Sequence, residues 1–318
     1  MSNIKLNILE NKYLRVKILD IGATLYEVFD KKKKTNLILN LGSIHRYHNN
    51  KAYLGSTCGR YANRIKNAQF KIDSTNYHLS SNEGKNLLHG GKIGFDKKLW
   101  KIIKLSKNSI DYQLISPDQE EGFPGEVTVN CRYSINKNNL IINLIAKTSK
   151  KTHINLVNHA YWNLEKQKKN IFDHELFINA DCYLKNDKFN IPTGKLVDVK
   201  NTPFDFRNFN KIGNQIKKNK KGFDENFVLK KGILVSKLKS TKNKILLKIY
   251  SNQPGVQFYT GQHLNIKYKD KFLRPFQGLC LETQAFPNSP NMKKFPSTLL
   301  IPGKKYSHSI KFEITHFN

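Results

Sequence analysis

The chain of 318 residues is poor in cysteine and in long apolar runs, and each shortage excludes a class of protein. No apolar run reaches the length of about 18 residues that a transmembrane helix needs. The N-terminus, MSNIKLNILENKYLRVK, lacks the apolar core of a signal peptide and predicts a first strand instead. Cys58, Cys131, Cys182 and Cys280 lie far apart and form no C-x-x-C pair. We therefore expect free thiols in a cytoplasmic protein, with no zinc or redox site.

Acidic residues are also scarce, since 24 Asp and Glu face 55 Lys and Arg, which gives a net charge of +31. A basic excess of this size suits a nucleic acid or an anionic membrane as partner. The excess is mostly Lys in predicted loops, such as KKKK at 31–34 and KKNKK at 217–221, whereas Arg, the preferred reader of bases, is sparse. We therefore expect a solvated lysine-rich surface, with neither nucleic acid nor membrane as partner.

Long helical patterns with caps are missing too, and strand patterns dominate. Turn clusters separate the runs, and no linker or repeat divides the chain, so we predict one domain over 1–318. Regularly spaced strands predict an all-β fold, a large antiparallel β-sandwich or barrel, with long loops at 186–224 and 283–298 that could carry function. Runs rich in Val, Ile, Tyr, Phe and Thr predict strands over 13–22, 70–79, 100–106, 109–116, 126–135, 140–149, 174–184, 244–251, 255–264, 279–286 and 306–314.

One strand-like stretch, VNHAYWNL at 157–164, carries an imidazole and a phenol among apolar residues. Alternation along a strand places His159, Tyr161 and Asn163 on one face. The alternative is a structural core histidine whose ring nitrogens are hydrogen-bonded to backbone groups. Because Tyr161 shares its face, and because both groups donate and accept hydrogen bonds, we expect a site there.

Two later strands carry polar groups in the same way. In LCLETQAF, alternation places Glu282 on the strand face opposite to that of Leu281, and burying an unpaired Glu is costly. A solvent-facing or Arg-paired Glu is the alternative, but the proline-rich turn that follows favours a carboxylate at the rim of a cleft. In GVQFYTG, Gln257 points away from Val256 and Phe258, so it projects either into a site or into solvent.

Loop motifs supply further candidates. Asn63 and Arg64 lie in GRYANRI, and the Arg side chain offers a rigid fork of donors. We expect Arg60 in the same motif only to pair with a surface carboxylate. His89 precedes two glycines, where the backbone can approach a ligand closely, and Asp224 in GFDENF suits a loop carboxylate that holds hydroxyl groups. The alternatives are that Arg64 pairs with a surface carboxylate and that His89 and Asp224 are ordinary turn residues.

Taken in order, these motifs resemble those of the aldose 1-epimerase (galactose mutarotase) family, from about residue 55 to about 303. The resemblance implies a galactose mutarotase-like supersandwich that interconverts the anomers of a free aldohexose such as glucose or galactose. It implies His159 as general acid and Glu282 as general base. It also implies a sugar-binding set of Asn63, Arg64, His89, Tyr161, Asp224 and Gln257. The segments that carry the resemblance are CGRYANRI (58–65), NLLHGG (86–91), VNHAYWNL (157–164), TPFDFR (202–207), GFDENFVL (222–229), PGVQFYTGQHL (254–264) and LCLETQAFPNSPN (279–291).

Anomer exchange needs one base and one acid on opposite sides of the reacting centre, both poised near working pH. The many lysines should lower the pKa of His159, whereas nearby carboxylates should raise it. We expect the carboxylates to have the larger effect, so that the imidazole can act as the acid. No redox step or strong Lewis acid is required, and the histidines lack zinc-ligand spacing, so we expect no cofactor and no metal. We expect a monosaccharide as the partner and a monomer or homodimer as the oligomeric state.

Two positions depart from the family pattern, because Glu225 stands where His is common and Asn288 where Asp is common. Either departure could shift substrate preference or loop stability. Three other functions stay open. A glycoside hydrolase could use Asp224 and Glu282 as a carboxylate pair. A non-catalytic sugar-binding module could share the fold. A sugar-phosphate 1-epimerase would suit the basic charge.

Overall fold

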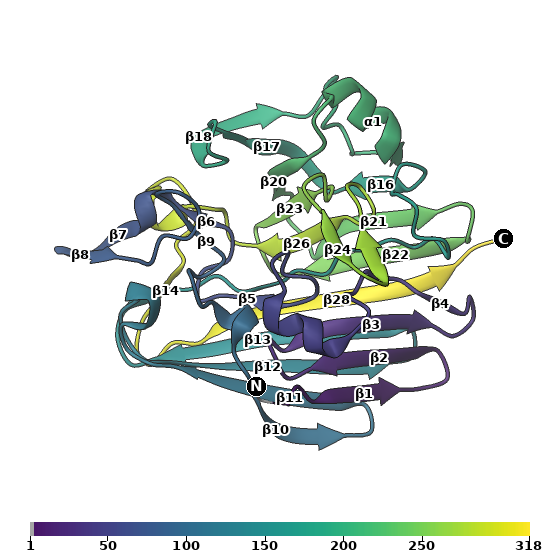
Figure 1. Cartoon of the computed structure of the whole chain (residues 1–318). Coiled ribbons are helices and arrows are strands. Elements are labelled where there is room, and N and C mark those ends of the chain that lie inside the picture. The colour runs from purple at the N-terminus through teal and green to yellow at the C-terminus, as the bar shows by residue number, and fades with distance from the viewer. Residues whose placement is uncertain (1–2) are drawn as a thin grey trace.

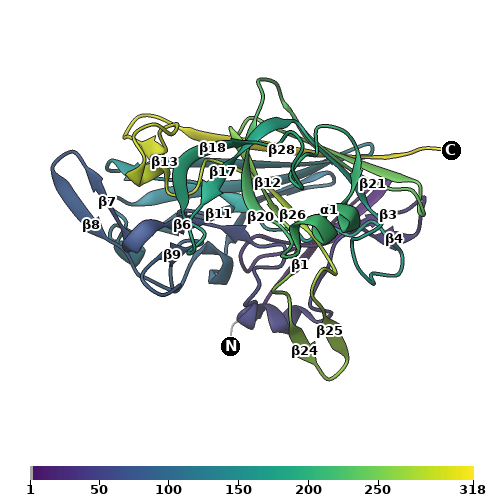
Figure 2. The ribbon, with the colours of Figure 1, turned by 90° about the horizontal axis from the view of Figure 1, so that it is seen from above.

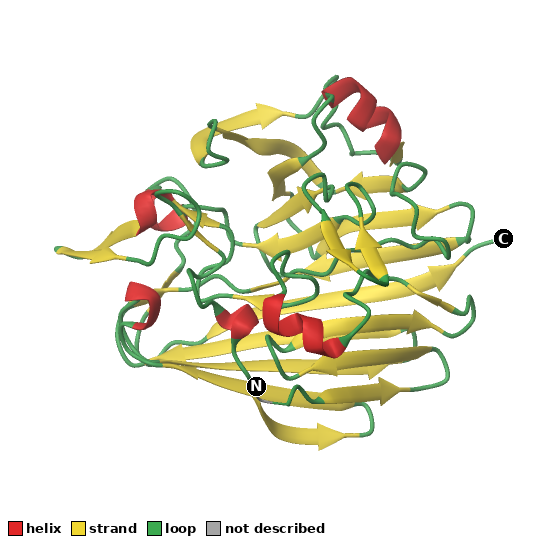
Figure 3. Ribbon diagram, in the orientation of Figure 1, coloured by secondary structure: helices red, strands yellow, loops and turns green. Residues whose placement is uncertain are grey.

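The computed structural model describes residues 3–318, and antiparallel strands make up most of its regular secondary structure, with only a few short helices (Figure 3). This confirms the all-β sandwich expected from the sequence. The largest sheet has nine strands, which run along the back of the molecule in Figure 1. In sheet order they are β10 (Lys101–Ser106), β11 (Ser109–Ser116), β12 (Val127–Asn136), β13 (Asn139–Thr148), β28 (Tyr306–His316), β22 (Ile245–Ser251), β21 (Leu234–Ser240), β16 (Glu175–Ile178) and β19 (Asn210–Lys211).

Two smaller sheets form the front layer (Figure 1). Hydrogen bonds join the two layers: the Asn7 Nδ2 of the front layer donates to the Tyr112 hydroxyl of the large sheet, and the Tyr133 hydroxyl of the large sheet donates to the Ala23 carbonyl. The four-stranded sheet contains β1 (Leu6–Glu10), β2 (Leu14–Leu19), β3 (Thr24–Asp30) and β4 (Thr35–Asn36). The five-stranded sheet has the order β18 (Pro192–Asp198), β17 (Ala180–Asn186), β20 (Asp224–Leu229), β23 (Gly255–Tyr259) and β26 (Cys280–Gln284).

The segment 157–164 joins the two front sheets. Trp162 exchanges backbone hydrogen bonds with Leu279, just before β26, and the Asn163 N–H donates to the Leu37 carbonyl, just after β4. Only Val157–Asn158, strand β15, belongs to a regular ladder. The predicted strand is therefore an extended connector. Its side chains still alternate in direction, because backbone hydrogen bonds to neighbouring segments hold it on both sides.

Alternating burial explains the sandwich. Along β12 and β13 every second residue is buried, and these side chains join one continuous apolar core. Under the five-stranded sheet, Phe206, Phe223, Phe227 and Phe258 pack ring to ring. The opposite face of β23 and β26 is therefore free to carry polar groups.

Short elements complete the fold, and Figure 2 shows the β7–β8 and β24–β25 hairpins projecting from the body. The paired strands are β5 (Thr57–Cys58) with β15, β6 (Arg64–Ile65) with β9 (Leu87–Leu88), β7 (Gln69–Ile72) with β8 (Thr75–His78), β14 (Thr152–His153) with β27 (Leu299–Leu300), and β24 (Ile266–Tyr268) with β25 (Lys271–Leu273). The helices are α1 (Ile212–Asn219) and the 3₁₀ turns η1 (Ile44–Asn49), η2 (Lys66–Ala68), η3 (Phe95–Lys97), η4 (Glu120–Gly122) and η5 (Ser289–Asn291).

Several predicted boundaries are wrong. The strand expected over 70–79 is a hairpin, because Asp73 adopts a positive φ and reverses the chain. The strand expected over 174–184 is divided at Asn179 between the nine-stranded and five-stranded sheets. The loop expected over 186–224 contains β18, β19 and α1. Sequence patterns miss such divisions because tertiary pairing, not local propensity, decides them.

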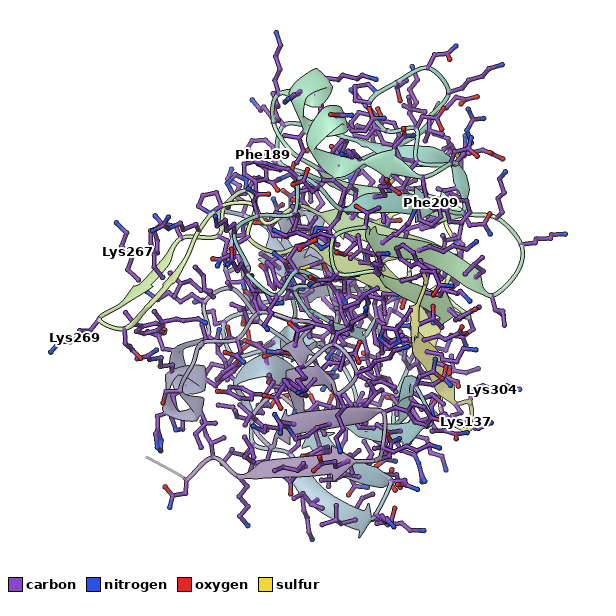
Figure 4. All side chains as sticks on the ribbon, turned by 90° about the vertical axis from the view of Figure 1, so that its right-hand side faces the viewer. Lys137, Phe189, Phe209, Lys267, Lys269 and Lys304 are labelled. Atoms are coloured by element: carbon purple, nitrogen blue, oxygen red, sulfur yellow. The ribbon has the colours of Figure 1, made fainter. Side chains whose placement is uncertain are left out.

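The lysines are spread over the surface. Figure 4 shows Lys267 and Lys269 at one edge of the molecule, and Lys137 and Lys304 near the opposite edge. This dispersal agrees with a solvated surface better than with one basic stripe. Within residues 3–318, every helix is too short or too polar to cross a membrane.

Candidate active site

A cavity of about 260 Å³ opens on the polar face of the five-stranded sheet. It approaches the lower end of the range for small-molecule pockets, about 300–1,000 Å³, which suits a ligand of one sugar ring. The structure brings all the sequence-predicted site residues to its wall, namely Asn63, Arg64, His89, His159, Tyr161, Asp224, Gln257 and Glu282.

The sheet wall of the cavity comes from β23 and β26. Gln257 and Glu282 are directly opposed in the antiparallel register, while Val256 and Phe258 enter the core on the reverse face. The alternation predicted for both strands is correct. The expected rim position of Glu282 is wrong, because the side chain is buried with only 3% of the residue exposed.

Asp224 completes this wall from the first residue of β20, so the expectation of a loop carboxylate is also wrong. The Gln257 Nε2 donates to Asp224 Oδ1 at 2.7 Å, which leaves the second carboxylate oxygen available to a ligand. The Gln257 Oε1 has no hydrogen-bond partner within residues 3–318. Since buried polar atoms are rarely left unpaired, this oxygen is a further candidate for ligand contact.

The opposite wall carries aromatic rings. His159 and Tyr161 project from the connector 157–164 with ring centroids 5.1 Å apart, and His89 lies 5.2 Å from His159. Asn163, predicted on the same face, does not line the cavity; its amide donates to the Gln277 and Asn170 carbonyls.

The glycine that follows His89 has a structural role. A Cβ at Gly90 would lie 1.8 Å from the Gly59 carbonyl oxygen, so this glycine permits close backbone packing rather than close approach to a ligand.

The two walls meet at His159 and Glu282. The His159 Nε2 lies 3.7 Å from Glu282 Oε1, and the Cys280 Sγ lies 3.5 Å from the other ring nitrogen, Nδ1. The Glu282 Oε2 has no hydrogen-bond partner in the described part of the chain. The two residues expected to act as acid and base therefore lie side by side, whereas positions on opposite sides of the reacting centre were expected. This arrangement can still serve a sugar, because the anomeric hydroxyl oxygen and the ring oxygen are bonded to the same carbon.

Burial sets the protonation of this pair. It lowers the pKa of His159 to about 4. Burial also raises the pKa of Glu282 well above its ordinary value, the Asp224 carboxylate adds to that shift, and Arg64 opposes it. The expectation that local carboxylates would keep the imidazole charged is wrong, because desolvation outweighs them. Over a wide pH range the pair therefore holds one proton, mostly on the carboxyl group.

His89, His159 and Glu282 also form a possible metal-ligand set, since one atom from each lies within 4.8 Å of the others. The hydrogen bonding of His89 argues against it. The backbone N–H of Asn63 donates to His89 Nδ1 at 3.2 Å, so this nitrogen carries the lone pair and Nε2 carries the proton. Burial lowers the pKa of His89 well below its ordinary value, so the ring is neutral. His89 therefore offers the cavity a donor rather than a metal ligand.

The arginines of the 58–65 motif differ in role. Arg64 makes a bidentate ion pair with Glu83, with contacts of 2.6 and 2.8 Å, and still lines the cavity. Glu83 thus holds the guanidinium in place. Arg60 does not pair with a surface carboxylate as expected; it is buried and donates to backbone carbonyls of Phe123 and Gly125, among others.

The two departures from the family pattern both brace this site. The Glu225 Oε2 accepts the backbone N–H of Asp224 at 2.8 Å, and burial raises the Glu225 pKa to about 7. The Asn288 side-chain Oδ1 accepts the backbone N–H of Lys66 at 3.0 Å, and the backbone N–H of Asn288 donates to the Arg64 carbonyl at 2.8 Å. Both residues act through the backbone of a cavity residue, so neither touches the ligand space directly.

Sequence reasoning missed part of the lining, namely Lys51, Tyr53, Tyr259 and His263. Tyr53 is the most important of them, because its ring lies 4.6 Å from His89 and 5.8 Å from His159. It belongs to the turn after η1, where no alternation could reveal its direction. Tyr259 could have been found, because it has the same strand parity as Gln257.

The chain is similar to several known proteins. A family model described as aldose 1-epimerase matches residues 5–313. The chain is 40% identical to human galactose mutarotase, over 96% of this chain and 93% of that protein. It is 33% identical to aldose 1-epimerase of Escherichia coli, over 97% and 94% of the two chains. The structure is similar to that of the GalM/aldose epimerase homologue from C. elegans, with a TM-score of 0.94, 30% identity and coverage of 99% and 100%.

Proposed function

The chain belongs to the aldose 1-epimerase family, and we propose that it interconverts the α and β anomers of a free aldohexose through His159 and Glu282. The observation that supports these two residues is their distance of 3.7 Å in one buried cavity the size of a sugar ring. The pair holds one proton, which is what a reaction with one acid and one base requires.

The ring-opening step starts from the less populated form of the pair, in which the shared proton has moved from Glu282 to His159 and Glu282 is a carboxylate. Glu282 takes the proton from the anomeric hydroxyl group while His159 gives its proton to the ring oxygen. The bond between C1 and the ring oxygen breaks, and C1 becomes an aldehyde. The bond between C1 and C2 then rotates and presents the other face of the aldehyde.

Ring closure reverses both transfers. His159 takes the proton back from the C5 hydroxyl, whose oxygen attacks C1, and Glu282 returns its proton to the former aldehyde oxygen. The enzyme regains its starting state, and positioned proton transfer of this kind contributes about 10²–10⁴-fold in rate.

The remaining cavity residues hold the sugar during the rotation. Asp224 and Gln257 offer acceptors to sugar hydroxyls, and Arg64 and the Nε2–H of His89 offer donors. Tyr161 supports the His159 ring at 5.1 Å. Asn63 acts mainly through its backbone, which fixes the His89 tautomer.

Polarimetry tests the proposal directly. Freshly dissolved α-glucose and α-galactose should reach equilibrium faster with the protein than without it. Release of reducing sugar from a glycoside, with no faster anomer exchange, would instead support a hydrolase that uses Asp224 and Glu282. Binding of either sugar without faster exchange would indicate a non-catalytic module.

We further place the enzyme in the cytoplasm, as a monomer or homodimer that acts on monosaccharides without nucleic acid or membrane. The buried free thiols of Cys58, Cys131 and Cys280 suit a reducing compartment. Which aldose is preferred follows from comparing kcat/KM for glucose and galactose, which differ only at C4.

A further inference from the structure

Two side chains of strand β26 contact the two ring nitrogens of His159. Cys280 and Glu282 are two residues apart on this strand, so both point to the same face of the sheet, with Cα atoms about 6.7 Å apart. The Cys280 Sγ lies 3.5 Å from His159 Nδ1, and the Glu282 Oε1 lies 3.7 Å from His159 Nε2. One strand therefore offers one group to each nitrogen of the imidazole.

The Cys280 side chain is a neutral thiol. It is completely buried, and burial raises the pKa of the thiol well above its ordinary value, with the Glu282 and Asp224 carboxylates adding to that shift. A neutral thiol is both a weak donor and a weak acceptor of hydrogen bonds. The contact by itself therefore allows two arrangements: the S–H donates to an unprotonated Nδ1 of His159, or a protonated Nδ1 donates to the sulfur.

The proton shared with Glu282 decides between the two arrangements. This proton rests mostly on Glu282 and has to reach the Nε2 of His159 before ring opening. Nε2 can accept it only with a lone pair, and a neutral imidazole then carries its own proton on Nδ1. The Nδ1–H therefore donates to the Cys280 sulfur. In histidines generally, the hydrogen bond at one ring nitrogen sets the protonation of the other.

A backbone oxygen near the ring does not replace the sulfur. The carbonyl oxygen of His159 itself also favours a proton on the imidazole. That oxygen already accepts the backbone N–H of Gly55 at 2.9 Å. Among the side chains of the described residues, Cys280 supplies the hydrogen-bond partner of Nδ1. The orientation and the tautomer of the ring therefore depend on this thiol.

A sulfur atom also suits the role of His159 as an acid. A carboxylate in its place would put a negative charge beside the ring and raise the pKa of His159. The thiol orients the ring without adding charge, so the protonated imidazole gives up its proton readily to the ring oxygen of the sugar. The other rings around His159 are neutral as well, because burial raises the pKa of Tyr53 and Tyr161 and lowers that of His89. Their centroids lie 5.8, 5.1 and 5.2 Å from that of His159.

We propose that Cys280 is a positioning residue for the reaction, whose sulfur accepts the Nδ1–H of His159 and so keeps Nε2 free to take the proton shared with Glu282. The inference rests on the proposed function, because it assumes that His159 passes this proton to the sugar. The thiol itself exchanges no proton, and no bond to sulfur forms or breaks.

NMR of protein labelled with nitrogen-15 histidine reads the tautomer directly, because protonated and unprotonated ring nitrogens give separate resonances. His159→Ala assigns the signals, and in the parent protein at neutral pH we expect a protonated Nδ1 and an unprotonated Nε2. Cys280→Ala should let the other tautomer appear and lower kcat roughly 3- to 10-fold, the effect of one neutral hydrogen bond, while KM changes by less than about twofold.

Two further variants separate positioning from packing. In Cys280→Ser the hydroxyl group can accept the same N–H, so this variant should keep the parent tautomer and recover most of the turnover. Cys131→Ala removes an equally buried thiol from β12, outside the cavity, and should change neither the tautomer nor kcat. If the Cys280→Ala protein does not fold, the parent spectrum and the Ser variant still decide the matter.

An unprotonated Nδ1 in the parent protein would overturn the proposal. So would a Cys280→Ala protein that keeps the parent turnover, or one that loses turnover with its tautomer unchanged, since that loss would come from packing. Each of these results leaves the mutarotase function standing. If the parent protein exchanges the anomers of neither glucose nor galactose faster than buffer does, the proposed function fails, and the positioning role of Cys280 fails with it.

Discussion

Replacing Glu282 with Gln should abolish most of the turnover and at the same time stabilise the protein. The amide keeps the shape of the carboxylate but cannot accept a proton, so the rate should fall about 10²–10⁴-fold. Binding of the sugar should persist, because Arg64, Asp224 and Gln257 still line the cavity.

The stability effect follows from burial. The pKa of Glu282 is raised on folding, so the folded protein holds this proton more tightly than the unfolded chain. Its contribution is therefore most favourable below the ordinary pKa, near 4.3, and is lost as the pH rises toward the raised pKa. Each pH unit above the ordinary pKa lowers the free energy of unfolding by up to about 1.4 kcal/mol. The loss is therefore at most about 3–4 kcal/mol at pH 7.

The Gln variant does not carry this cost. Its amide can also donate to the unpartnered Gln257 Oε1 on the opposed strand position. Because the amide still buries polar atoms, we expect a gain in the free energy of unfolding of about 1–3 kcal/mol at pH 7. The gain should shrink toward pH 4.5.

Urea unfolding at both pH values, beside polarimetry on α-glucose and α-galactose, measures the two effects. Glu165→Gln is the matched control, since Glu165 is also buried but accepts a 2.6 Å hydrogen bond from Ser240 outside the cavity. The control should keep its turnover and gain no stability. A Glu282→Gln protein that turns over within tenfold of the parent, or that is less stable at pH 7, would refute the reasoning.

The remaining predictions concern the same cavity. His159→Ala should still bind sugar in equilibrium dialysis but lose about 10²–10⁴-fold in turnover, and catalysis near the parent rate would remove His159 as the acid. The rate should form a plateau from about pH 4 up to the raised pKa of Glu282, because the pair keeps one proton throughout that range; an acid limb near the ordinary histidine value of about 6.5 would contradict this. Asp224→Asn should raise KM roughly 10- to 100-fold through a weaker charged hydrogen bond, measured by initial rates, while an unchanged KM would exclude Asp224 from binding. Treatment with a chelator should leave the rate unchanged because the protonated His89 Nε2 cannot ligate a metal, and a loss restored by Zn²⁺ would overturn that tautomer.

Local pattern was enough for the parts of the site that lie on regular strands. The alternation of GVQFYTG and LCLETQAF places Gln257 and Glu282 on the polar faces of β23 and β26, and the structure confirms both directions. The same alternation separates His159 and Tyr161 from the core-facing Trp162, even though 157–164 is a connector rather than a full strand. Side-chain direction in an extended chain follows from backbone geometry alone, so these features could be predicted without knowledge of their partners.

The sequence by itself determined the all-β class, the direction of these side chains and the residue types available for proton transfer. Only the tertiary structure decided that Tyr53 and Lys51 close the cavity, that a neighbouring backbone N–H fixes the His89 tautomer, and that Arg60 is buried on backbone carbonyls. It also decided the protonation of His159 and Glu282. These properties depend on desolvation and on contacts between segments that lie far apart in the chain, and neither is encoded in the spacing of neighbouring residues.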